Sequence, residues 1–210
     1  MPGLRTLRTF VFMLTALCAI STASAANFVL NPGFETGDFT SWTAQGWTVT
    51  TGYFSEVPFA GSYYAYTGCV GQNCITGTAA QQASLSQTLA TTAGQTYTLT
   101  FEFMTQGNGT PNELDVLWNG TSVLDLGPGG TLGPISSYTL YTVSNLSATS
   151  SSSTLTFLGR QDPAYDALDN VDVEPNQTSS IPEPSTWLLV GGAALLPLLR
   201  AARRRTLTSR

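Results

Sequence analysis

Apolar and polar residues alternate with a two-residue period in the clearest stretches of the chain. In Tyr97-Thr98-Leu99-Thr100-Phe101-Glu102-Phe103, one parity is Tyr, Leu, Phe and Phe, and the other is Thr, Thr and Glu. Such alternation places one face of a β-strand against a core and the other toward solvent. No stretch between 27 and 174 sustains the 3.6-residue period of an amphipathic helix. The pattern predicts an antiparallel all-β fold.

Turn residues separate further short strands. Asn119-Gly120 lies between apolar stretches 113–118 and 121–126 and predicts a β-hairpin, because both central positions of a type I′ turn take positive φ. The other predicted strands are 27–30, 47–50, 85–89, 138–143, 155–158 and 167–173. Short strands separated by Gly-, Pro- and Ser-rich turns are typical of a β-sandwich, here one domain spanning 27–174.

The two ends of the chain follow a different pattern. Arg5 and Arg8 precede an apolar run over 10–20, and Ala23-Ser24-Ala25 is a small-residue cleavage site. Residues 1–25 are therefore predicted to be a secretory signal peptide that signal peptidase removes. At the other end, a short linker (175–181) leads to 182–205. Its apolar run over 186–199 is predicted to be a transmembrane helix, although a full span needs roughly 20 apolar residues.

Residues 182–205 combine three features in a fixed order. The triplet Pro182-Glu183-Pro184 comes first, the apolar run follows, and a basic cluster ends it, which by the positive-inside rule stays in the cytoplasm. The cluster consists of Arg200, Arg203, Arg204 and Arg205. This order resembles the PEP-CTERM sorting signal of Gram-negative bacteria. The resemblance implies that an exosortase recognises the triplet and removes the tail. The protein would be held transiently in the inner membrane and then reach the cell surface or the extracellular space. A plain C-terminal anchor is the alternative.

Positive charge is confined almost entirely to these end segments. Only Arg160 of the eight basic residues lies between 26 and 183, whereas all thirteen acids lie between Glu35 and Glu183. The exported part therefore carries a net charge of −12. Nucleic-acid binding needs clustered Lys and Arg, so no nucleic acid is expected as a partner.

The residue types present also limit the chemistry. The chain has no His and no Lys, which removes the commonest general base and the Ser–His type of nucleophile activation. Asp162, Asp166, Asp169 and Asp172 cluster near the end of the domain, and a glycosidase needs in principle only two suitably placed carboxylates. Any acidic β-sandwich shows as many, so the protein is predicted not to be an enzyme, with a carboxylate-dependent hydrolase as the lesser alternative.

One pair of cysteines remains in the exported part. Cys18 leaves with the signal peptide, and Cys69 and Cys74 are left as an even pair. In an exported protein such a pair predicts a local disulfide. A metal or redox role is the alternative, although the spacing is not C-x-x-C.

A second resemblance lies at the start of the domain. Asn31-Pro32-Gly33-Phe34-Glu35-Thr36-Gly37, with Trp42 downstream, is similar to the opening of galactose-binding-like jelly-roll domains, a group that includes many carbohydrate-binding modules. Ser86-Gln87-Thr88-Leu89 to Phe103 resembles a stretch common in the same superfamily. The resemblance implies a jelly roll. Phe34 and Trp42 are predicted to be buried at one end of the sandwich, with sugar stacking as the alternative.

Asp169 is the most informative acid of the domain. It shares its strand parity with Val171 and Val173, so a strict two-residue period turns the carboxylate toward the core. A buried, unpaired carboxylate is costly. With almost no basic residue available, a bound cation is the natural partner, and oxygen ligands favour calcium.

The second resemblance supplies a ligand set for this cation. It implies a structural calcium between Glu35 and Asp169, and backbone carbonyls around Asn31 and Gly37 could supplement the two carboxylates. Two alternatives stay open. The carboxylate of Asp169 could accept hydrogen bonds from backbone amides of the opening loop, or a β-bulge could turn it outward.

Four tyrosines are candidates for binding a saccharide: Tyr53, Tyr63, Tyr64 and Tyr66. Flat ring faces match the C–H faces of sugars, but these residues could equally alternate in and out of a strand. The sequence as a whole predicts an exported, exosortase-sorted surface or extracellular-matrix protein, associated with exopolysaccharide, with a calcium-stabilised jelly-roll domain. The alternative is a carbohydrate-binding module that recognises one polysaccharide.

Overall fold

The computed structural model describes residues 26–53, 56–68, 82–107 and 109–176. The predicted signal peptide, most of the linker, the sorting segment and the pair Cys69 and Cys74 lie outside the described residues. Within the ranges described, no helix is long and apolar enough to cross a membrane.

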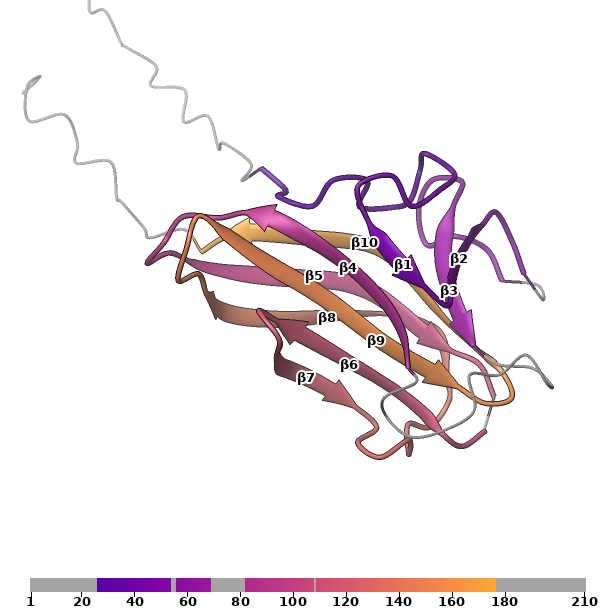
Figure 1. Cartoon of the computed structure of the whole chain (residues 1–210). Coiled ribbons are helices and arrows are strands. Elements are labelled where there is room, and N and C mark those ends of the chain that lie inside the picture. Colours follow the sequence, from indigo (N-terminus) through magenta and orange to yellow (C-terminus); the bar gives the residue numbers. More distant parts are fainter. Residues whose placement is uncertain (1–25, 54–55, 69–81, 108, 177–210) are drawn as a thin grey trace, which may run out of the picture.

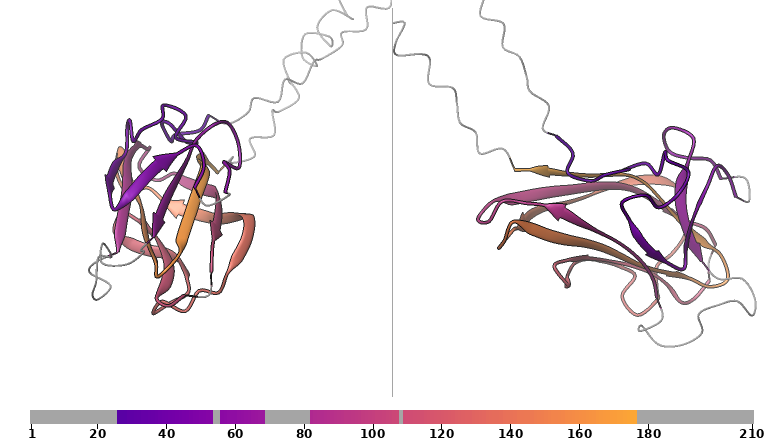
Figure 2. Two further views of the ribbon diagram at one scale, coloured as in Figure 1. Left: turned by 90° about the vertical axis from the view of Figure 1, so that its right-hand side faces the viewer. Right: turned by 45° about the horizontal axis from the view of Figure 1, so that its top comes forward.

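Ten strands form two five-stranded antiparallel sheets that pack face to face (Figures 1 and 2). Sheet A has the order β1 (Thr43–Gln45), β4 (Ala83–Ala90), β9 (Ser152–Gln161), β6 (Asn112–Trp118) and β7 (Thr121–Leu126). Sheet B has the order β2 (Trp47–Thr50), β3 (Tyr64–Gly68), β10 (Tyr165–Pro175), β5 (Thr96–Thr105) and β8 (Ile135–Ser147). This arrangement confirms the predicted antiparallel β-sandwich.

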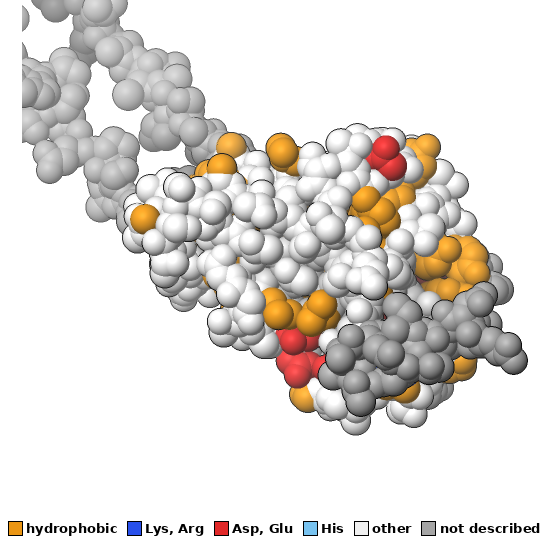
Figure 3. Space-filling view, in the orientation of Figure 1, with side chains coloured by type: hydrophobic (Ala, Val, Ile, Leu, Met, Phe, Trp, Pro, Cys, Tyr) orange, Lys and Arg blue, Asp and Glu red, His pale blue; other side chains and the backbone are white. Residues whose placement is uncertain are grey.

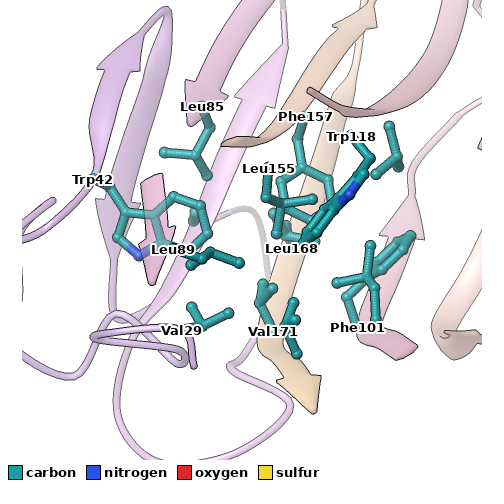
Figure 4. Close-up of a cluster of buried hydrophobic side chains, with 14 of the residues drawn as sticks. Val29, Trp42, Leu85, Leu89, Phe101, Trp118, Leu155, Phe157, Leu168 and Val171 are labelled. Carbon is teal, nitrogen blue, oxygen red and sulfur yellow. The ribbon is translucent and has the colours of Figure 1, made fainter. Parts of the chain in front are cut away.

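The core lies between the sheets and follows the alternation in the sequence. Tyr97, Leu99, Phe101 and Phe103 of β5 are all buried, as the pattern predicts. Figure 4 shows Phe101 among aliphatic and aromatic side chains from both sheets. Its ring meets that of Phe157 edge to face, with centroids 5.2 Å apart, so the two sheets are joined through aromatic contacts.

The opening loop closes one part of this core. Phe34 is fully buried and Trp42 is 7% exposed, with ring centroids 5.7 Å apart. The indole N–H of Trp42 donates to the Asn31 carbonyl at 3.1 Å. Both rings are therefore core residues, as predicted, and neither presents an open face for sugar stacking.

The prediction of a strand at 27–30 is wrong. Phe28 N–H donates to the Val173 carbonyl, but the Asn27 side chain takes the neighbouring ladder positions. Its Oδ1 accepts from Val173 N–H and its Nδ2 donates to the Val171 carbonyl. The side chain thus replaces the backbone pairing that a strand would make.

The ends of β10 lie at opposite ends of the sandwich. The described chain enters at residue 26 and leaves at residue 176 at one end (Figure 1), close to Pro175. Tyr165 begins the strand at the other end, about 30 Å away at 3.3 Å per residue. A side chain near Tyr165 therefore faces away from the two chain ends.

Candidate functional site

Two faces of sheet B have different surroundings. Ala65 in β3 and Leu168 in β10 pack into the main core between the sheets. Tyr64, Met104 and Ala167 form a separate buried cluster, with Tyr66 and Tyr138 packed against it. Because strand neighbours alternate, this second cluster lies on the outer face of sheet B, away from sheet A. The segment 56–63 passes over this face, since Phe59 lies edge-on to Tyr138 with centroids 5.8 Å apart.

Three tyrosines gather at the edge of this face, and we call them the tyrosine cluster: Tyr53, Tyr66 and Tyr165. The rings of Tyr53 and Tyr66 stack with centroids 4.7 Å apart and an interplanar angle of 15°. Tyr165 meets Tyr53 edge to face at 4.8 Å, and their hydroxyl groups are 3.1 Å apart. All three side chains are half-buried. Burial raises the pKa of Tyr165 to about 12, so its hydroxyl stays protonated at neutral pH.

The four tyrosines named from the sequence have different positions. Tyr53 and Tyr66 belong to the cluster, whereas Tyr64 is fully buried beneath it, and burial raises the pKa of its phenol to about 12. Tyr63 lies beside the opening loop, because a Cβ added to Gly37 would be 3.3 Å from its hydroxyl. Tyr64 therefore cannot stack on an external ligand in this conformation, and Tyr63 is not part of the cluster.

Tyr165 was missed by the sequence reasoning. Its partner in the ladder is Gly68, and Ala167 pairs with Tyr66, so Tyr165 lies one diagonal step from Tyr66. The residue follows Asp162-Pro163-Ala164, a turn-like stretch that carries no strand signal of its own. Only the pairing of β3 with β10, nearly a hundred residues apart in sequence, brings the two rings together.

Apolar and acidic side chains continue this face beyond the cluster. Val57, Phe59 and Leu140 are 67%, 48% and 57% exposed. Glu56 is 8% exposed, and burial raises the pKa of its carboxyl to about 7. Charge is sparse elsewhere as well: in Figure 3 uncharged groups cover most of the molecular face shown, and acidic side chains occur only in small groups.

Asp169 faces outward, so the prediction that it points toward the core is wrong. The ladder between β10 and β5 shifts register between Asp169 and Asp172, and Asn170 has φ +51°. This β-bulge places Asp169 on the same face as Ala167, and returns Val171 to the core. The segment 56–63 covers the carboxylate, which is fully buried. The sequence had left this bulge open as an alternative.

Backbone amides surround both candidate metal ligands. Asp169 Oδ2 accepts from Ala60 N–H at 3.1 Å, and Oδ1 accepts from Asn170 N–H at 2.7 Å. Burial raises the pKa of Asp169 to about 6, these amides oppose the shift, and the negative charge of Glu35 adds to it. The Glu35 carboxylate accepts from Ser62 N–H at 2.9 Å and 3.0 Å and from Tyr63 N–H at 3.1 Å. Both carboxylates thus anchor the segment 60–63.

The remaining proposed metal contacts come from backbone positions of the opening loop. The Asn31 carbonyl already accepts hydrogen bonds from Phe34 N–H and Trp42 Nε1. Gly37 has φ +76°, which turns the chain at that point. In the described ranges, no group of three or more His, Cys, Asp or Glu residues converges as a metal site.

Three of the four clustered acids lie in different surroundings. Asp166 shares the parity of Leu168 and lies between the sheets, whereas Asp169 lies on the outer face. Asp162 pairs with Arg160 at 2.8 Å.

Comparison with known proteins supports the fold. The sequence matches no protein family model, and no curated protein is significantly similar to it. The structure resembles that of TmCBM61 in complex with beta-1,4-galactotriose, at 17% identity and a TM-score of 0.53, over 71% of this chain and 98% of that one. It also resembles the CBM22-1 xylan-binding domain of Paenibacillus barcinonensis Xyn10C, at 15% identity and a TM-score of 0.49, over 76% and 100%. A third is the K1 cleaved adhesin domain of Lys-gingipain from Porphyromonas gingivalis W83, at 19% identity and a TM-score of 0.48, over 69% and 96%. At these identities the likeness shows the fold alone.

Proposed function

We propose that this protein is a carbohydrate-binding module whose ligand lies against the outer face of sheet B at the tyrosine cluster. The observation that carries the proposal is the cluster itself, three half-buried aromatic rings assembled from segments far apart in the sequence. Aromatic residues supply a flat apolar surface together with polar hydroxyl groups. A sugar presents the same combination, with C–H groups on one face and hydroxyl groups around its rim.

The charge of the domain favours a neutral polysaccharide. Arg160 is the sole basic residue between 26 and 183, and it pairs with Asp162. A domain with twelve acids and one arginine, of net charge −11, repels an anionic polymer at low ionic strength. The bound oligosaccharide of the TmCBM61 structure is a neutral galactan fragment, which is consistent with a ligand of this class.

The position of the cluster suits a displayed protein. It lies at the end of β10 opposite the two chain ends, about 30 Å from Pro175. A tail that holds the C-terminus at a membrane would leave the tyrosine cluster at the end of the domain farther from that membrane.

A glycan array with matched variants tests the proposal. We expect the protein to retain at least one neutral polysaccharide and the Tyr66→Ala variant to lose at least tenfold in affinity. Tyr63→Ala removes a half-buried tyrosine outside the cluster and should retain the ligand, which controls for a general loss of stability. Absence of any retained glycan at high micromolar protein, or equal loss in both variants, would contradict the proposal.

We also propose that the tail over 182–205 directs exosortase-dependent sorting to the cell surface or extracellular matrix. The order of the triplet, the apolar run and the arginines supports this proposal. Glu183→Ala should leave full-length protein in the inner membrane, as followed by fractionation and blotting. Normal release of the variant would refute the sorting signal and leave the binding proposal untouched.

Calcium between Glu35 and Asp169 stays a proposal of its own. The two carboxylates flank Gly33, whose added Cβ would be 3.4 Å from Asp169 Oδ1 and 3.8 Å from Glu35 Oε1. The negative charge of Glu35 adds to the raised pKa of Asp169, and a cation between the two carboxylates would relieve this repulsion. Calcium should raise the unfolding midpoint of wild type by more than that of Asp169→Asn. If chelator leaves the unfolding midpoint of wild type unchanged, the calcium proposal is contradicted. The hydrogen bonds from backbone amides would then account for the burial of both carboxylates.

A further inference from the structure

A group of buried polar side chains lies between the two sheets, at the end of the sandwich where β5 leads into β6 and β9 into β10. Asn112 and Gln161 come from sheet A and are partners in the β6–β9 ladder. Thr105 and Asp166 come from sheet B and are partners in the β10–β5 ladder. All four residues have no exposed surface. We call them the interior polar cluster.

Thr105 lies at the centre of this cluster. Its Oγ1 accepts a hydrogen bond from Asn112 Nδ2 at 2.9 Å and another from Gln161 Nε2 at 3.0 Å. Burial raises the pKa of Asp166, which lies directly across the ladder, and a hydrogen bond from the Thr105 hydroxyl opposes this shift. The other three side chains therefore lie around one threonine.

The orientation of the two amides is determined by backbone carbonyls. Asn112 Nδ2 also donates to the Leu132 carbonyl at 3.0 Å, and Gln161 Nε2 also donates to the Gln106 carbonyl at 2.7 Å. Rotating either amide by 180° would set an oxygen against a carbonyl oxygen. The amide oxygens must consequently be Asn112 Oδ1 and Gln161 Oε1, as they stand.

Asn112 Oδ1 and Gln161 Oε1 have no hydrogen-bond partner, and the two carboxylate oxygens of Asp166 have at most the Thr105 hydroxyl between them. A buried acceptor without a donor is destabilising, and a buried carboxylate more so. Burial raises the pKa of Asp166 to about 8, which reflects this cost. When Asp166 is ionised, the Thr105 hydroxyl and one buried water donate at most three hydrogen bonds to these four oxygens, so one acceptor stays unmatched.

We propose that the interior polar cluster is a binding site for a hard divalent cation, with Asp166, Asn112 and Gln161 as its side-chain ligands. One carboxylate and two amide carbonyls are oxygen donors of the kind that calcium selects, and calcium completes its shell of six to eight oxygens with water or backbone carbonyls. The site is separate from Glu35 and Asp169, which lie on the other face of sheet B. A cation bound at the interior polar cluster would link the two sheets at the end of the sandwich that carries the tyrosine cluster.

Thermal unfolding of the full chain in mild detergent tests this site, with calcium or chelator at pH 8.5, where Asp166 is ionised. Asp166→Asn removes the charge but adds an amide donor for the unmatched oxygens. In the presence of chelator, the midpoint temperature of this variant should equal or exceed that of wild type. Free calcium at about ten times its Kd should raise the midpoint of wild type by roughly 3 to 6 °C, and this rise should be smaller in Asp166→Asn.

Two controls separate this site from its neighbours. Asp162→Asn removes an acid from the same end of the molecule and should keep the calcium response of wild type. Asp169→Asn should keep at least part of the response if the interior site binds calcium by itself. The proposal is overturned if calcium leaves the midpoint of wild type unchanged, if Asp166→Asn responds as strongly as wild type, or if Asp169→Asn alone abolishes the response.

Discussion

Glu56 offers a direct test of how burial on the outer face of sheet B controls stability. Its backbone N–H donates to the Tyr53 carbonyl at 3.0 Å and closes the turn that carries Tyr53 of the tyrosine cluster. The side chain is 8% exposed, and Oε1 has no hydrogen-bond partner. Its charge acts on Tyr64, Tyr138 and Asp166. We predict that Glu56→Gln removes a large part of the pH dependence of unfolding near neutrality.

The sign follows from the direction of the pKa shift. Burial raises the pKa of Glu56 from 4.5 to about 7, so folding favours the protonated form. The stability associated with this group is fully present below pH 4.5 and is lost as the pH rises through 7. A shift of this size corresponds to at most about 3 kcal/mol between the two limits. Glutamine carries no charge at any pH, so the variant should lack this loss.

Urea unfolding at several pH values, in chelator, measures the effect. Wild type and Glu56→Gln should have similar free energies of unfolding at pH 4.5, and the variant should be more stable by roughly 1 to 3 kcal/mol at pH 8. The control is Asp38→Asn. Hydrogen bonds from Thr40 and Thr36 lower the pKa of Asp38, so its contribution is lost only in acid. If the free energies of unfolding of wild type and Glu56→Gln change in parallel between pH 5 and pH 8, the reasoning is refuted.

Three further experiments, two of them with a control substitution, test the fold. Gly120→Ala should lower the free energy of unfolding, measured by urea titration, by about 1 kcal/mol. The cause is the φ of +78° alone, because nothing lies within 4 Å of the added Cβ. Gly133→Ala, which is equally open but has no positive φ, should leave the free energy of unfolding unchanged. Asn170→Val should lower the free energy of unfolding by about 1 to 3 kcal/mol, because valine is strained at the φ of +51° that the bulge requires. Asn170→Gly should leave the free energy of unfolding nearly unchanged. An equal loss in both variants would show that the bulge does not depend on this residue. Phe157→Ala should lower the free energy of unfolding by about 3 to 5 kcal/mol with an unchanged m-value, and a loss below about 1 kcal/mol would mean that the core collapses around the cavity.

Local pattern was enough to predict the elements that depend on nearest neighbours. The alternation in 97–103, the Asn119-Gly120 turn and the two aromatic anchors Phe34 and Trp42 all appear in the structure as predicted. Their causes are local, since side-chain parity, a turn with positive φ and the burial of large rings all act over a few residues. The strands β8 and β9 extend beyond the predicted ranges, because their Ser and Thr positions continue the ladders without an apolar signal.

Asp169 shows where local pattern fails. Strict parity points its side chain to the core, and one residue of positive φ at Asn170 reverses that direction. A bulge is a property of two paired strands and of the segment that covers them, so the sequence of β10 could leave it only as an alternative.

The sequence determined that the chain between 26 and 183 is acidic and that histidine and lysine are absent, and its two-residue alternation predicted the antiparallel sandwich. Tertiary structure alone decided which side chains meet. The tyrosine cluster needs the pairing of β3 with β10, and the interior polar cluster needs one residue from each of four strands in two sheets. Both sites depend on long-range register, which a two-residue period cannot specify because it places a residue on a face of a strand but not beside a particular partner.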